Sequence, residues 1–123
     1  MSDELNIAAT EDTPHIKFER KGLLNISGRS LPEDAFSFYS PVLEWLNAYI
    51  KSAPATTSVI FNLEYFNTAS SKQIFKISTI LSELSKSKTV TVKWHYDDGD
   101  KDMCDSGDRF SKLTGINFEL VKN

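Results

Sequence analysis

Small polar side chains cluster between residues 67 and 72, after an apolar alternating segment and before a helical pattern. Asn, Thr and Ser oxygens accept hydrogen bonds from the free amides of a first helical turn, so the cluster predicts a helix cap. A hydroxyl here is also a candidate phosphoacceptor, because those amides and the helix dipole favour an anion. Its phosphate would add about two negative charges at one surface spot. The spacing leaves Thr68, Ser70 and Ser71 all eligible.

The same helix start supports a second hypothesis, a small binding module in which Asn67 to Ser71 hold a free anionic ligand. The amides that favour a covalent phosphate would equally favour a free phosphate or a nucleotide. Such a module would be stabilised thermally by its anion.

A run of aspartates after residue 96 is the next candidate for chemistry. Asp98, Asp100 and Asp102 have the alternate spacing of calcium-loop ligands. However, Met103 occupies the position of the required glycine, and Arg109 that of the bidentate acid. The segment is therefore interpreted as a solvated turn whose acids favour the start of the following helix.

No group of residues assembles a catalytic site in this sequence. His15 and His95 lack neighbours with nucleophile or ligand spacing, and Cys104 lacks a CxxC partner. Gly-rich phosphate loops, HExxH and GxSxG are also missing from the sequence. We therefore predict a non-enzymatic protein with no metal and no cofactor. An enzyme using His95 and the acidic turn is the least supported of three hypotheses.

Two apolar stripes run along the first predicted helix. One has the spacing of a core face and comprises Phe36, Tyr39, Leu43, Leu46 and Ile50. The other comprises Phe38, Val42, Trp45 and Tyr49. Together they cover more than one face, so Phe38, Trp45 and Tyr49 belong either to the core or to a partner interface.

Alternating segments predict strands, and apolar residues spaced by three and four predict helices. Ser30 and Glu33 have capping-box spacing and predict that the first helix begins near Pro32. The order is strand-strand-helix-strand-helix-strand-helix-strand, with strands at 15–19, 24–27, 58–66, 89–96 and 116–120. Helices between strands imply crossovers, and clean alternation implies one open face. We predict a two-layer α/β domain over residues 14–123, with a mixed, mostly parallel sheet, helices mainly on one face and a flexible tail over residues 1–13.

Composition narrows the class of protein. The 123 residues are 40% hydrophobic and 25% charged, which is typical of a globular chain. A net charge of −3 argues against nucleic-acid binding. No apolar run is long enough to insert into a membrane, and the polar N-terminus is not a secretory signal. With its one cysteine, the sequence predicts a protein of the reducing cytoplasm.

Short segments spread from about residue 13 to residue 121 carry a further signal: Thr13-Pro14, Gly28 to Asp34, Phe38-Tyr39, Trp45-Leu46, Tyr65 to Ser70, Trp94 to Asp97 and Gly107 to Phe110. In this ordered set the sequence resembles the SiaC family of bacterial regulatory phosphoproteins. That family resembles anti-sigma-factor antagonists of the STAS type, in which a phosphorylated Ser or Thr begins the helix after a central strand. The resemblance implies a STAS-like fold.

The resemblance also implies a function, partner switching. Thr68 is the implied phosphoacceptor, modified by an anti-sigma-factor-like kinase and dephosphorylated by a PP2C-type phosphatase. The unphosphorylated protein would bind and activate a diguanylate cyclase, which raises cyclic-di-GMP and promotes biofilm formation. The family's Asn-Thr-Ser-Ser reads Asn-Thr-Ala-Ser here, so Thr68 keeps the matching hydroxyl. The implied partner-binding residues are Tyr65, Asn67, Thr68, Ala69, Ser70, Ser71 and Lys72.

Overall fold

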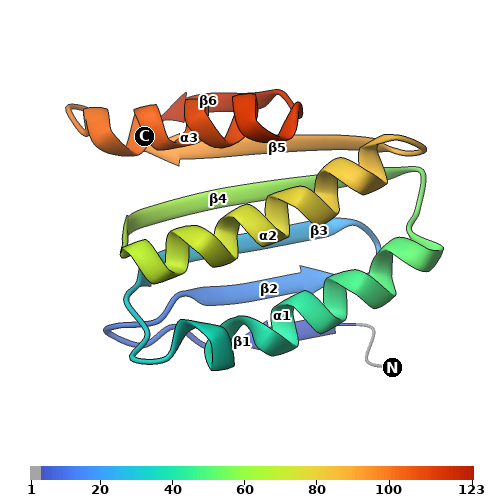
Figure 1. Ribbon diagram of the computed structural model, residues 1–123, viewed down its shortest axis with the longest axis horizontal. Coiled ribbons are helices and arrows are strands. Elements are labelled where there is room, and N and C mark those ends of the chain that lie inside the picture. The colour runs from blue at the N-terminus through green and yellow to red at the C-terminus, as the bar shows by residue number, and fades with distance from the viewer. Residues whose placement is uncertain (1–3) are drawn as a thin grey trace.

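The computed structural model describes residues 4–123 and arranges six strands in one mixed sheet (Figure 1). The strands are β1 (Glu4–Ile7), β2 (His15–Glu19), β3 (Leu23–Ser30), β4 (Thr56–Phe66), β5 (Thr89–Tyr96) and β6 (Phe118–Lys122). The helices are α1 (Ala35–Tyr49), the short η1 (Ile50–Ser52), α2 (Thr68–Ser85) and α3 (Lys101–Thr114).

Strand order in space follows strand order in the sequence. β1, β2 and β3 form an antiparallel meander, whereas β3, β4, β5 and β6 pair in parallel. Each parallel step is bridged by one of the helices, and Figure 1 shows all three on the same face of the sheet. The predicted α/β fold, with helices on one face, is confirmed. Within residues 4–123, no helix is both long enough and apolar enough to cross a membrane.

The N-terminal segment differs from the prediction of a flexible tail over residues 1–13. That prediction is wrong for Glu4–Ile7, which forms the edge strand β1 and pairs Ile7 with Ile16 of β2. Its apolar residues Leu5 and Ile7 are half-buried against the core, and their alternation is too short to stand out in a sequence. Residues 1–3 of the predicted tail lie outside the described residues.

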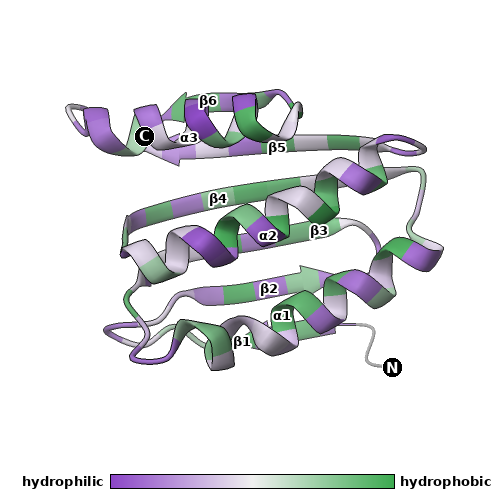
Figure 2. Ribbon diagram, viewed as in Figure 1, coloured by the Kyte–Doolittle hydropathy of each residue, from purple (hydrophilic) through white to green (hydrophobic). Residues whose placement is uncertain are grey.

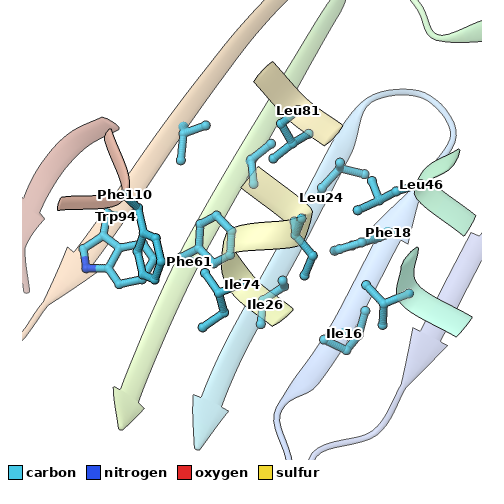
Figure 3. Close-up of a cluster of buried hydrophobic side chains, with 14 of the residues drawn as sticks. Ile16, Phe18, Leu24, Ile26, Leu46, Phe61, Ile74, Leu81, Trp94 and Phe110 are labelled. Atoms are coloured by element: carbon cyan, nitrogen blue, oxygen red, sulfur yellow. The ribbon is translucent and has the colours of Figure 1, made fainter. Parts of the chain in front are cut away.

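The core lies between the sheet and the helices. In Figure 3, Phe61 of β4 lies between Trp94 of β5 and the β3 residues Leu24 and Ile26, next to Ile74 of α2. Each of these side chains is at most 2% exposed. Hydrophobic and hydrophilic segments alternate along the strands in Figure 2, as expected for a sheet with one covered face.

The buried face of α1 combines the two predicted stripes. Tyr39 and Leu46 are fully buried, but Phe36 of the same stripe is 67% exposed. The helix instead packs through residues of the second stripe, of which Val42, Trp45 and Tyr49 are buried. Trp45 and Tyr49 stack at 5.0 Å between ring centroids, so they belong to the core, and Phe38 is half-buried beside it.

The start of α1 also differs from the prediction. Asp34, not Ser30, is the N-cap, and its carboxylate accepts hydrogen bonds from the Ser37 N–H and hydroxyl at 3.1 and 2.8 Å. These bonds lower the pKa of Asp34. The predicted capping box is wrong because Ser30 is still the last residue of β3, with its side chain fully buried.

Helix α3 packs against Trp94 through a glycine. A Cβ atom on Gly107 would lie 2.6 Å from Trp94 Cγ and 2.9 Å from Leu120 Cδ2, well inside van der Waals contact. The Trp94 indole N–H donates to the Met103 carbonyl of the same helix at 2.9 Å. Gly107 therefore permits a close approach of α3 to β5 that no other residue would allow.

Candidate functional site

Helix α2 begins immediately after β4, and Asn67 fixes its first turn. The Asn67 backbone is extended (φ −86°, ψ 176°), and its side-chain oxygen accepts from the Ser70 N–H at 2.8 Å. Its carbonyl accepts from the Ser71 N–H at 2.9 Å, and its own N–H donates to the Ser30 carbonyl at 3.1 Å. Asn67 is thus a helix cap that also ties α2 to the end of β3.

Thr68 is the first residue of α2, and its side chain is exposed. Among residues 4–123, no acceptor contacts the backbone N–H of Thr68 or of Ala69. A phosphate on Thr68 would lie beside these amides and at the positive end of the α2 dipole. Lys72, also exposed, follows at i+4, the spacing at which helical side chains form ion pairs.

Ser70 is completely buried and belongs to a chain of hydroxyls. Its hydroxyl donates to the Ser30 carbonyl at 3.0 Å and accepts from the Ser30 hydroxyl at 2.8 Å. The Tyr39 hydroxyl lies 2.6 Å from the Ser30 hydroxyl. Tyr39 is the donor of this hydrogen bond because the Ser30 hydroxyl already donates to Ser70. A kinase could not reach Ser70 without unfolding the first turn, so the structure distinguishes it from exposed Thr68.

Tyr39, at one end of this chain of hydroxyls, is fully buried from solvent. Burial raises the pKa of Tyr39 to about 12, and the hydrogen bond with Ser30 offsets only part of the effect. The chain joins α1, β3 and α2, so it fixes the start of α2 relative to α1.

A β-bulge places Tyr65 beside the site. Gly28 of β3 pairs with Leu63, but Arg29 pairs with Tyr65, so β4 carries one extra residue here. The alternation that buries Val59, Phe61 and Leu63 stops at this bulge. Tyr65 is 50% exposed, and Phe66 takes the inward position instead, with its ring 6.1 Å from that of Trp94.

An open hollow of about 690 Å³ adjoins Thr68, between the starts of α1 and α2. Acidic Glu33 and Asp34 and the exposed Phe36 ring line its α1 side. Its α2 side is lined by Thr68, Ala69, Lys72 and Gln73.

The predicted partner-binding residues therefore divide into two groups. Tyr65, Thr68, Ala69 and Lys72 are exposed, so a partner could contact them. Asn67 and Ser71 are half-buried, and Ser70 is fully buried. Because Asn67 and Ser70 are buried or half-buried and hydrogen-bonded to each other and to Ser30, their role is to stabilise the start of α2.

The other candidate residues do not converge. Asp100 is the N-cap of α3 and accepts from the Met103 N–H at 3.0 Å. His95 contacts the Asn123 side chain at 2.9 Å, and His15 contacts the Asn6 side chain at 3.1 Å. Over residues 4–123, no three His, Cys, Asp or Glu side chains lie close enough together to hold a metal ion.

Sequence reasoning missed the second half of the site. Ser30 and Tyr39 meet Ser70 only in the folded chain, because Ser30 and Ser70 are 40 positions apart in the sequence. Glu33 and Phe36 were assigned to a capping box and a core stripe, yet they line the hollow next to Thr68. The excess of apolar residues on α1 was the one signal that part of this helix faces outward.

Comparison with known proteins fits this geometry. Residues 7–123 match the model of the SiaC family regulatory phosphoproteins. This chain belongs to the SiaC family. The family description is regulatory, so this member is a regulatory protein and not an enzyme.

Solved structures of SiaC from Pseudomonas aeruginosa share the fold of this SiaC-family chain. Apo-SiaC has a TM-score of 0.88 at 26% identity, covering 98% of this chain and 99% of that one. SiaC in complex with the diguanylate cyclase SiaD, which it activates, has a TM-score of 0.90 at 25% identity, covering 97% and 99%. An uncharacterised protein of P. aeruginosa strain UCBPP-PA14 is 29% identical to this chain over 122 residues. The match covers 98% of this chain and 96% of that protein.

Proposed function

We propose that this SiaC-family protein is a partner-switching regulator whose switch is reversible phosphorylation of Thr68. An anti-sigma-factor-like kinase adds the phosphate and a PP2C-type phosphatase removes it. The unphosphorylated form binds and activates a diguanylate cyclase and so raises cyclic-di-GMP and promotes biofilm formation. The activator role of the P. aeruginosa relative towards SiaD supports the choice of partner.

The observation that carries the proposal is the contrast between neighbouring hydroxyls. Thr68 is exposed at the first position of an 18-residue helix, next to two backbone amides that have no acceptor in the described part of the chain. Ser70 is fully buried, and its hydroxyl donates to the Ser30 carbonyl and accepts from the Ser30 hydroxyl, while its N–H donates to the Asn67 side-chain oxygen. Of these two hydroxyls, Thr68 is the one that a kinase could reach.

Phosphorylation would change the charge of this surface without refolding it. The new anion would be held by the Thr68 and Ala69 amides and by Lys72, all of which are already in place. A partner that docks on a neutral or cationic α2 start would then meet about two negative charges. The mechanism is electrostatic and steric, and it acts at an interface.

The local charges argue against the alternative of a free anionic ligand. Two carboxylates, Glu33 and Asp34, face one cation, Lys72, in the hollow beside Thr68. Hydrogen bonds from Ser37 lower the pKa of Asp34, so its carboxylate is ionised near neutral pH. A free anion would enter against this repulsion, whereas a covalent phosphate is held at Thr68 by its ester bond.

The test combines kinase labelling with a matched hydroxyl control. The protein is incubated with ATP and its organism's anti-sigma-factor-like kinase, and phosphopeptides are mapped by mass spectrometry. We expect phosphate on Thr68, its loss in Thr68→Ala and its retention in Ser71→Ala. The phosphorylated and unphosphorylated proteins are then added to the cyclase. Phosphate on Ser71, or equal cyclic-di-GMP output from both forms, would contradict the proposal.

A further inference from the structure

Ser30 is the last residue of β3, and the start of α2 is hydrogen-bonded to it. Its carbonyl accepts from the Asn67 N–H at 3.1 Å and from the Ser70 hydroxyl at 3.0 Å. Its hydroxyl donates to the Ser70 hydroxyl at 2.8 Å. Both serines are completely buried, although they are 40 positions apart in the sequence. Ser30 therefore anchors the first turn of α2 to the sheet.

Tyr39 of α1 fixes the direction of the Ser30 hydroxyl. The two hydroxyl oxygens lie 2.6 Å apart, and Tyr39 is fully buried. A serine hydroxyl carries a single proton. Because Tyr39 donates to the Ser30 oxygen, the Ser30 proton is directed to Ser70, and each hydrogen bond of such a buried chain strengthens the next. Tyr39 thus acts on Ser70 through Ser30.

The burial of Ser70 decides which of two neighbouring hydroxyls is available to an enzyme. Thr68 and Ser70 are two positions apart at the start of α2, about 3 Å along the helix axis. Thr68 is exposed and Ser70 is not. Phosphoryl transfer to Ser70 therefore requires the first turn to open, and its rate follows the population of the open form. The hydrogen bonds of Ser30 lower that population.

A phosphate on Ser70 would also disrupt the start of the helix. Its negative charge, about two units, would lie in a site with no exposure and face the Ser30 carbonyl oxygen. On Thr68 the same phosphate would lie in water, beside the Thr68 and Ala69 amides. The choice of hydroxyl therefore decides whether phosphorylation changes the charge of the surface or unfolds the first turn.

We infer that Ser30 and Tyr39 are specificity-determining residues for the phosphorylation of this protein, because they mask Ser70 and so confine the kinase to Thr68. In this reaction the γ-phosphoryl group of ATP passes to the Thr68 hydroxyl oxygen, ADP leaves, and the hydroxyl proton is released to solvent. The inference rests on the proposed function, since it requires a kinase that acts at the start of α2. Ser30 and Tyr39 are both fully buried, so they act on the choice of hydroxyl from inside the protein.

The test compares the share of phosphate on Ser70 between the wild type and variants of the full chain, after incubation with ATP and the anti-sigma-factor-like kinase. Ser30→Ala removes the hydrogen bond donated to Ser70 at 2.8 Å. The open population, and with it the initial rate at Ser70 relative to Thr68, should rise about fivefold. Tyr39→Phe keeps the Ser30 hydroxyl but frees its direction, so we expect a smaller rise. Peptide mapping by mass spectrometry at early times measures both sites.

Thr57→Val is the matched control. Thr57 of β4 is fully buried, and its hydroxyl lies 2.6 Å from that of Tyr49, which is also on α1. The variant therefore also removes a strand hydroxyl from a buried tyrosine, but at the ends of α1 and β4 that lie far from the start of α2 (Figure 1). It should lower the overall stability and leave the Ser70 share unchanged.

Hydrogen exchange of the unphosphorylated protein gives a second readout that needs no kinase. The Ser70 and Ser71 N–H groups both donate to Asn67, so they exchange when the first turn opens. We expect about fivefold faster exchange of both amides in Ser30→Ala and no change in Thr57→Val.

Phosphate on Thr68 with an unchanged Ser70 share in both Ser30→Ala and Tyr39→Phe would overturn this inference and leave the proposed function standing. An equal rise in Thr57→Val would also overturn it, because general destabilisation would then explain the effect. A wild type without phosphate on any residue would instead contradict the proposed function itself.

Discussion

Removing one hydroxyl at a time from the start of α2 separates the structural residue from the switch residue. Ser70→Ala deletes one donated and one accepted hydrogen bond, at 3.0 and 2.8 Å, from a site with no exposure. The Ser30 carbonyl keeps its bond from the Asn67 N–H, and the Ser30 hydroxyl keeps Tyr39, so no buried group loses every partner. Each lost bond costs about 1 kcal/mol.

Alanine recovers roughly 0.5 kcal/mol through its higher helix propensity. The net loss in the free energy of unfolding is therefore about 1–2 kcal/mol. Thr68→Ala removes an exposed hydroxyl and should change it by less than about 0.5 kcal/mol. A chain of this length has an unfolding entropy of roughly 0.26 kcal/mol per kelvin, so Ser70→Ala should lower Tm by about 4–8 °C.

Urea denaturation and calorimetry of the wild type and both variants measure these differences directly. The phosphorylation assay gives the complementary result, in which Ser70→Ala still accepts phosphate and Thr68→Ala does not. The reasoning is refuted if Thr68→Ala is destabilised as much as Ser70→Ala, or if Ser70→Ala unfolds at the wild-type urea midpoint.

Three further predictions concern other parts of the molecule. Gly107→Ala should lower the free energy of unfolding by about 1–3 kcal/mol, because the clash with Trp94 outweighs the helix-propensity gain; greater stability in urea would contradict the close packing. Asn67→Ala should lose about 1 kcal/mol of helix capping while Asn67→Asp retains it, as measured by thermal unfolding; equal losses would count against the cap. Because the pKa of Tyr39 is raised to about 12 in the folded chain, the unfolded chain loses this proton at a lower pH. The contribution of Tyr39 to the free energy of unfolding is therefore constant below about pH 10 and falls between about pH 10 and pH 12. Tyr39→Phe should make this fall shallower in denaturation curves, and an unchanged slope would show that Tyr39 ionises normally.

The sequence predicted the parts of the fold that depend on local periodicity. β5 was predicted at 89–96 and lies at Thr89–Tyr96, because its alternation is unbroken and its ends are marked by polar turns. The N-terminal strand was missed because Glu4–Ile7 is an edge strand that gains its stability from pairing with β2.

Of the candidate site, the sequence predicted only the residues at the start of α2. Asn67 and Thr68 occupy the predicted cap and first-turn positions, since capping depends on neighbouring residues. The burial of Ser70 depends on Ser30 and Tyr39, and the exposure of Tyr65 depends on a bulge against β3. These are contacts between distant segments, which neither periodicity nor spacing encodes.

The central claim is that Thr68 carries a reversible phosphate. Intact-mass and peptide-mapping mass spectrometry of the protein from its native cells, with and without a PP2C-type phosphatase, tests this most directly. The account predicts a phosphate on the peptide containing Thr68 that the phosphatase removes, in protein whose Ser70 is unmodified. Unmodified Thr68 under every growth condition would contradict it and leave Thr68 as an exposed residue of a helix start.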